Sequence, residues 1–155
     1  MAGPLRDDLL AHASRVYPDE VGGILTGYQN GVDAVVAVLI GPGAASTSTP
    51  MSFTPDGPYH AAEMARVYAE SEGRFGYLGD WHTHPNGVAG LSALDVRTLR
   101  AIARARSARC ENPLMLVAAG SPESWTLAGF TLGPKRWLTR RTPMAVTLRV
   151  FDPPR

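Results

Sequence analysis

Two histidines at the end of a predicted strand, followed by the start of a helix, constrain the fold of this chain most. Residues 75–84 are rich in aromatic and apolar side chains and end in His82-Thr83-His84. Side chains alternate between the two faces of a strand, so His82 and His84 point the same way. Pro85 cannot donate to the sheet ladder and is expected to end the strand.

A helix is predicted to begin at Ser92, after a short loop that contains Gly87 and Gly90. Ser92 and Asp95 lie three residues apart and therefore share one face of its first turn. A chain that turns back in this way can bring Asp95 over the two histidines. The stretch would then supply two nitrogen ligands and one oxygen ligand, as in a catalytic zinc site that keeps its fourth position open.

Each motif alone has a simpler explanation. A histidine pair on a strand is often only a polar strand surface, and Ser-x-x-Asp is a capping motif with Ser92 at the N-cap and Asp95 at N3. The two explanations are independent, so finding both motifs together across a short glycine loop favours a metal site. A cap would also hold Asp95 rigid, so capping does not exclude metal binding.

The spacing of these residues resembles the signature of the JAMM metallopeptidases, which are also called MPN-type or JAB-type proteins. That family places a glutamate near the start of the chain, in a Glu-x-x-Gly-x-Leu-x-Gly setting. Glu20 and the residues after it read Glu-Val-Gly-Gly-Ile-Leu-Thr-Gly. Asp19 is the adjacent competitor, but it would face the opposite side if Glu20 began a strand. In the order of elements, the resemblance extends from the first helix to Leu132.

The resemblance implies a role for each residue of the signature. His82, His84 and Asp95 would bind zinc, with one ion per chain. Glu20 would act as the general base, and Ser92 would steady the tetrahedral oxyanion. This set suits amide hydrolysis, because zinc lowers the pKa of bound water to about 7 and a nearby carboxylate can carry its proton to the leaving amine.

The alternation of elements predicts an α/β fold of the JAB/MPN type, with a single central mixed β-sheet flanked by helices. A helix that begins near Leu5 is expected to stop before Pro18, and a second is expected between Pro58 and Gly73. Asn-Gly at residues 30–31 predicts a hairpin, whereas residues 41–57 are expected to form a loop or an irregular edge. Strands are predicted over residues 21–28, 32–40, 75–84, 114–119 and 125–132, and a half-exposed strand over residues 146–150.

Composition favours one globular domain over residues 1–155, because hydrophobic residues make up 45% and charged residues 19% of the chain. The net charge of +1 gives no electrostatic case for nucleic-acid binding. The chain shows no secretory signal and no apolar run of about 18 residues, so we expect a cytoplasmic protein that does not bind a membrane. Cys110, the only cysteine, is expected to be structural, the alternative being a thiol nucleophile.

Arginines are concentrated in two segments. A solvated helix face would explain the first group, and the alternative is a docking surface for an acidic or mixed-charge partner. The first group is Arg97, Arg100, Arg104, Arg106 and Arg109, and the second is Arg136, Arg140 and Arg141.

The resemblance also implies a substrate class. JAMM enzymes cleave amide or isopeptide bonds after the C-terminal Gly-Gly tail of ubiquitin-like proteins, and the setting of residues 77–81 is most similar to compact bacterial members. The long insertion of eukaryotic members after the motif aspartate has no room here, which favours a single modifier or a precursor tail. Expected partners are a ubiquitin-like or sulfur-carrier protein and the activating or conjugating enzymes of its pathway. A non-catalytic scaffold and a zinc deaminase are the alternatives, although the deaminase signature is missing.

Overall fold

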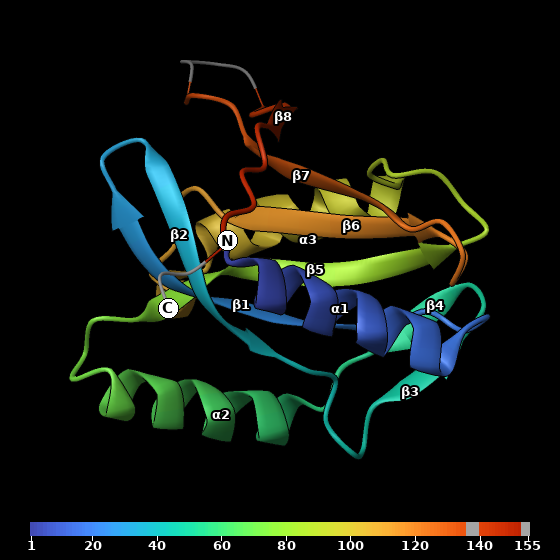
Figure 1. The fold of residues 1–155 in the computed structure, drawn as a ribbon. Helices are drawn as coiled ribbons and strands as arrows, with labels where there is room; N and C mark the ends of the chain where they lie inside the picture. Colours follow the sequence, from blue (N-terminus) through green and yellow to red (C-terminus); the bar gives the residue numbers. More distant parts are fainter. Residues whose placement is uncertain (136–139, 153–155) are drawn as a thin grey trace.

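The computed structural model describes residues 1–135 and 140–152 of the chain. Helices and strands alternate along this part of the sequence (Figure 1). The helical elements are α1 (Gly3–Val16), α2 (Gly57–Glu70), α3 (Ala93–Arg104) and the short 3-10 turn η1 (Arg106–Ala108). The strands are β1 (Gly22–Asn30), β2 (Asp33–Ile40), β3 (Thr47–Thr49), β4 (Ser52–Thr54), β5 (Gly76–Pro85), β6 (Leu114–Gly120), β7 (Thr126–Leu132) and β8 (Pro143–Val146).

The main sheet has six strands in the order β2-β1-β5-β6-β7-β8, and β3 and β4 pair separately. β5 and β6 run parallel, whereas the other neighbouring strands are antiparallel. α1 lies across one face of the sheet, α3 lies behind it, and α2 runs along the side of β1 and β2 (Figure 1). The prediction of an α/β fold with a central mixed sheet flanked by helices is confirmed.

The central strand β6 shows why helices cover both faces of the sheet. Leu116 lies in the same core cluster as Leu9 of α1. Its neighbour Met115 points to the other face and packs in a second cluster with Leu99 of α3. Because successive side chains alternate between faces, a strand covered on both sides has to be apolar at every position.

The first helix and the first hairpin form as the sequence predicts. α1 carries a proline in its first turn and ends at Val16, two residues before Pro18. β1 and β2 pair up to Asn30 and Asp33, and Gly31 in the turn has a φ of +63°. Gly31 is thus the first of the two turn residues between the paired Asn30 and Asp33, a place where a positive φ favours glycine.

The expectation for residues 41–57 is partly wrong, because β3 and β4 form a short hairpin there. Ser48 lies opposite Phe53, and Phe53 packs against the main core. The carbonyl of Thr49 accepts a hydrogen bond of 2.8 Å from the backbone N–H of Glu20. Both contacts join this hairpin to distant parts of the chain. The small and polar residues of the hairpin therefore do not predict them.

The predicted strand over residues 146–150 is also wrong in its extent. β8 ends at Val146, which pairs with Gly129 of β7. Beyond that point the backbone bonds to the first residues of the chain instead: the amino group of Met1 donates to the carbonyl of Arg149 at 2.8 Å. Leu148 does pack against the core, as the alternation of apolar and polar residues over 146–150 predicts. A strand, however, also needs a neighbouring strand along its whole length.

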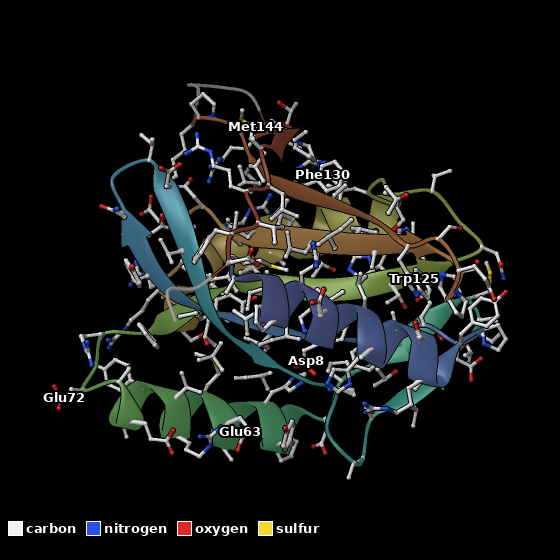
Figure 2. The ribbon with its side chains drawn as sticks, in the orientation of Figure 1. Asp8, Glu63, Glu72, Trp125, Phe130 and Met144 are labelled. Atoms are coloured by element: carbon white, nitrogen blue, oxygen red, sulfur yellow. The ribbon has the colours of Figure 1, made fainter. Side chains whose placement is uncertain are left out.

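Charged side chains such as Asp8 and Glu72 are exposed on the helical side of the molecule (Figure 2). Trp125 lies at the C-terminal end of α1, where its indole N–H donates to the Ser14 hydroxyl at 2.9 Å (Figure 2). None of the helices in residues 1–135 and 140–152 is long and apolar enough to cross a membrane. Arg136 of the second arginine group lies outside these residues.

Candidate metal centre

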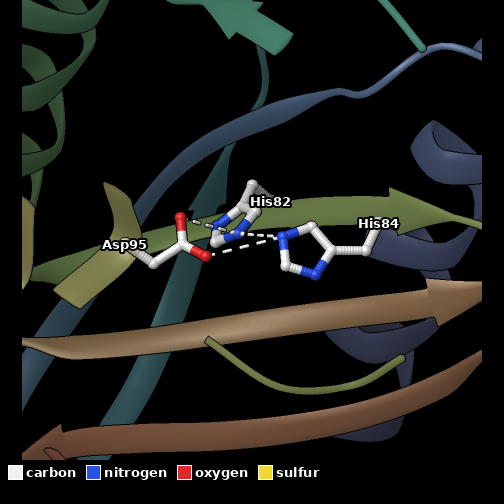
Figure 3. Close-up of side chains that lie close together, drawn as sticks. All are labelled: His82, His84 and Asp95. Carbon is white, nitrogen blue, oxygen red and sulfur yellow. Dashed lines mark hydrogen bonds and ion pairs between the residues drawn. The ribbon is translucent and has the colours of Figure 1, made fainter. Parts of the chain in front are cut away.

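His82 and His84 lie on β5, which is held in the interior of the sheet between β1 and β6. Their side chains point to the same face, and the two Nε2 atoms are 3.1 Å apart (Figure 3). Thr83 points to the opposite face, is fully buried, and accepts a hydrogen bond of 2.9 Å from the backbone N–H of Val21 through its hydroxyl oxygen. The strand alternation predicted from the sequence therefore sets the direction of both imidazoles.

Asp95 reaches the two histidines from the first turn of α3 (Figure 3). The capping box is complete: the Asp95 N–H donates to the Ser92 hydroxyl oxygen at 3.2 Å, and the Ser92 N–H donates to Asp95 Oδ2 at 2.7 Å. Oδ1 of Asp95 lies 3.3 Å from His82 Nε2, and Oδ2 lies 3.5 Å from His84 Nε2. One short segment thus forms the cap and directs the carboxylate at the imidazoles.

The three side chains have the chemistry and the spacing of a metal site. Their candidate ligand atoms all lie within 4.8 Å of one another, and in the described chain no other group of three or more His, Cys, Asp and Glu residues is arranged to hold a metal ion. In a tetrahedral zinc site with bonds of about 2.0–2.2 Å, ligand atoms are separated by roughly 3.3 Å. The two imidazole nitrogens are 3.1 Å apart, and each lies 3.3 or 3.5 Å from a different oxygen of the Asp95 carboxylate, so the separations are of this order. His82, His84 and Asp95 could therefore hold a metal ion.

The electrostatics of the cluster favour an ionised aspartate. Burial opposes ionisation of Asp95, but hydrogen bonds with His82 and His84, the charge of His82 and a hydrogen bond with Ser92 together hold its pKa far below the usual range. The hydrogen bond to Asp95 in turn raises the pKa of His84, against the effect of burial. The imidazoles keep 14% and 18% of their side-chain surface exposed, so solvent can reach the cluster.

Glu20 lies beside this cluster without being part of it. Burial raises the pKa of its carboxyl group, the charges of His84 and His82 lower it in part, and the charge of Asp95 raises it again. The next residue, Val21, forms two hydrogen bonds of 2.9 Å with Thr83, which lies between the two histidines, so the backbone of Glu20 is held close to them. Glu20 does not begin a strand, since β1 starts at Gly22. The alternation argument against Asp19 therefore does not apply.

Comparison with known proteins identifies the family of this chain. Residues 3–128 match the family described as prokaryotic homologs of the JAB domain. The chain belongs to this prokaryotic JAB family. The resemblance to JAMM metallopeptidases is confirmed, and with it the prediction that the protein is an enzyme of the JAMM peptidase type.

Named relatives of the JAB-family chain agree with this assignment. The probable metalloprotease y4qB of Sinorhizobium fredii is 36% identical over 140 residues, which cover 89% of this chain and 81% of the relative. The CD-NTase/cGAS isopeptidases of Escherichia coli and Vibrio cholerae are 24% and 27% identical over 106 residues. These alignments cover 68% of this chain and 65% of each isopeptidase.

The fold of the JAB-family chain is also similar to a solved structure. The solution structure of a protein from Desulfitobacterium hafniense superposes with a TM-score of 0.69 at 19% sequence identity. The superposition covers 97% of this chain and 91% of that one. At this level of identity, the likeness supports the fold alone.

One contact of this JAB domain was not predicted from the sequence. The Tyr17 hydroxyl donates to the Asn86 side-chain oxygen at 2.8 Å. Tyr17 precedes Glu20 by three residues, and Asn86 follows His84 by two. Asn86 has a φ of +58°, and its N–H donates to the carbonyl of Gly120 at 2.7 Å. The pair thus ties the segment that carries Glu20 to the segment that carries His84.

Two further titratable residues lie on or against β5. Burial raises the pKa of Asp80, although the Tyr77 hydroxyl donates to its carboxylate at 2.8 Å. Cys110 is buried, its Sγ lies 3.6 Å from the carbonyl of Leu78, and burial raises its pKa. A raised pKa disfavours the thiolate that a nucleophile needs, so Cys110 has the environment of a structural residue.

Proposed function

We propose that this protein is a zinc-dependent isopeptidase or peptidase that cleaves the amide bond after the C-terminal Gly-Gly tail of a ubiquitin-like protein. The observation that carries the proposal is the convergence of His82, His84 and Asp95 within 4.8 Å, with Glu20 beside them. Membership of the JAB family supports amide hydrolysis. The relatives named isopeptidases support a protein conjugate as the substrate class.

In this proposal His82, His84 and Asp95 hold one zinc ion. Bound zinc supplies Lewis-acid chemistry, because it acidifies water and polarises a carbonyl oxygen. Glu20 accepts a proton from the attacking water and passes it to the leaving amine. Its raised pKa suits that task, since a general base works best with a pKa near the working pH.

Ser92 is proposed to stabilise the oxyanion. Its hydroxyl oxygen accepts the N–H of Asp95, and a hydroxyl can donate and accept hydrogen bonds at once. The O–H is therefore available for a developing negative charge. Because Ser92 is the N-cap of α3, its position is fixed by the same cap that directs Asp95.

The surroundings of the centre support a slender substrate tail. Asp95 is followed only by the rest of α3, by η1 and by a short connection to β6, so no long insertion is available to grip a second modifier. A Gly-Gly tail bound in extended form beside a strand edge would meet little steric hindrance. A single modifier attached to a target protein fits this description. A sulfur-carrier protein that loses residues after its Gly-Gly sequence fits equally, and activating or conjugating enzymes are the expected pathway partners of either.

The decisive experiment replaces Glu20. We expect Glu20→Ala to bind one zinc per chain, as the wild type does, and to cleave a synthetic Gly-Gly amide about 10²–10⁴-fold more slowly. Glu72→Ala, which removes an exposed glutamate outside the centre, is the matched control and should cleave normally. A fully active Glu20→Ala protein would show that the general base is another group.

A further inference from the structure

Two arginine groups that are distant in the sequence meet on one surface. Residues in the last two turns of α3, together with Leu132, Lys135, Arg140 and Arg141, line an open pocket of about 400 Å³. Ala103 and Leu132 contribute its apolar part. Its cationic residues are Arg100, Arg104, Lys135, Arg140 and Arg141, and we call it the basic pocket.

Part of the basic pocket is rigid. The guanidinium of Arg141 donates to the carbonyls of Gly133 and Leu132 at 2.6 and 2.8 Å, and to the Asn112 side-chain oxygen at 2.6 Å. Arg100 Nε donates to the carbonyl of Arg141 at 3.0 Å. Neutral carbonyl and amide oxygens hold these cations in place without cancelling their charge, so the fold itself keeps positive charge at this point.

The positive charge of the basic pocket is largely uncompensated. Lys135 pairs with Glu111 at 3.0 Å. For the four arginines, no carboxylate lies within 4.0 Å among the residues that the structure describes. Among residues 1–135 and 140–152, no Asp or Glu lines the pocket. Since the whole chain has a net charge of only +1, the positive potential is local, and such a site attracts an anionic ligand.

The position of the basic pocket relative to the metal centre suggests its occupant. α3 begins at the cap that directs Asp95 and ends at Arg104, so its 12 residues span about 18 Å between the two sites. A protein interface of ordinary size covers about 800 Å² on each partner. A folded protein whose tail enters the metal centre can therefore also reach the basic pocket.

We propose that the basic pocket is a docking site for an acidic segment of the protein substrate. The inference rests on the proposed function, because it takes the substrate to be a protein. Forked guanidinium groups match carboxylates geometrically, and the apolar floor can accept the stems of glutamate side chains. The pocket would then contribute to the choice of substrate while the metal centre performs the hydrolysis.

Direct binding tests this proposal without any need for catalysis. The probe is a fluorescein-labelled decaglutamate peptide, followed by fluorescence anisotropy at about 0.15 M salt, with decaglutamine as the neutral peptide. We expect saturable binding of decaglutamate alone. Arg104→Glu and Arg140→Glu change exposed side chains, and each should weaken binding about tenfold.

The matched control is Arg6→Glu. Arg6 pairs with the adjacent Asp7 on α1, which lies on the opposite face of the sheet from α3 (Figure 1). This variant has the same net charge as the pocket variants, and we expect its binding to change by less than about twofold. An equal loss in Arg6→Glu would overturn the proposal, because net charge alone would then explain binding.

Two further outcomes would also overturn the inference. Displacement of the peptide by low concentrations of inorganic phosphate would identify a site for small anions. Absence of binding to the wild type would show that the pocket has no acidic ligand of this kind. His82→Ala should bind the peptide normally even if it has lost metal and activity. Peptide binding therefore tests the docking site, whereas metal content and hydrolysis test the proposed function.

Discussion

Glu20 and Asp95 are two carboxylates whose pKa values both depend on the same pair of histidines, yet the pKa values shift in opposite directions. Asp95 interacts with both imidazoles and accepts the Ser92 N–H, and its pKa is lowered despite burial. For Glu20 burial is the largest influence, and its pKa is raised. Direct hydrogen bonds therefore distinguish the two carboxylates in the way that the proposed roles require: a ligand stays ionised, and a general base takes up a proton.

The two residues are also held in place by different means. Asp95 is positioned by its own helix cap, within four residues of chain. Glu20 lies between α1 and β1. Its backbone N–H donates to the carbonyl of Thr49, and the Tyr17–Asn86 hydrogen bond anchors its segment. Substitutions that disturb one residue without the other can test this difference.

The largest effect is expected from Asp95→Asn. An amide is a weaker metal ligand than a carboxylate, so zinc affinity should fall at least about 100-fold and hydrolysis should be lost. Metal content after dialysis and competitive zinc titration would measure this. Because Glu20 is proposed to lie outside the ligand set, Glu20→Gln should retain its metal; loss of zinc in both variants would remove the distinction between them.

Ser92→Ala disturbs the Asp95 side of the comparison. Loss of the N-cap should lower the free energy of unfolding by about 1 kcal/mol, and loss of the oxyanion donor should reduce kcat about 10²–10³-fold. Denaturant titration and steady-state kinetics report the two effects separately. Ser92→Thr, which keeps a capping hydroxyl, should restore most of the stability; unchanged kcat in Ser92→Ala would limit the serine to capping.

Tyr17→Phe disturbs the Glu20 side. It removes the hydrogen bond to Asn86 but keeps the aromatic ring, which packs edge-on against Trp125. We expect kcat to fall about tenfold, because small displacements of a catalytic group are costly, while KM and metal content stay the same. Tyr17→Phe combined with Asn86→Gly should be no worse than the more affected single variant; additive losses would mean that the two residues act independently.

The smallest effect is a difference in pH dependence in metal-free protein. Asp95 has a lowered folded-state pKa, so it stabilises the fold above its unfolded-state pKa of about 3.9 and loses that contribution as the pH falls. The raised pKa of Glu20 has the opposite sign, because its ionisation costs stability as the pH rises. At pH near 7, Asp95→Asn should therefore lower the free energy of unfolding and Glu20→Gln should raise it. Denaturant titrations between about pH 3 and 7 would measure both changes. If both variants changed the free energy of unfolding in the same direction, the opposed pKa shifts would be contradicted.

The features that the sequence predicts well are those that depend on neighbouring residues. The common direction of His82 and His84 follows from the period of a strand, and the reach of Asp95 follows from a cap formed with Ser92. The hairpin at residues 30–31 and the end of α1 before Pro18 are equally local. Glu20 was identified only through the family resemblance, since an isolated glutamate in an irregular segment has no pattern of its own.

What the sequence alone determined is the metal-binding signature and the alternation of helices and strands, because backbone geometry fixes side-chain directions over a few residues. Only the tertiary structure decided how Glu20 is anchored, where β8 ends and that Arg104 and Arg140 share a pocket. Those outcomes depend on contacts between segments that are far apart in the chain. Such contacts form when apolar faces are buried together, and no local pattern of residues encodes them.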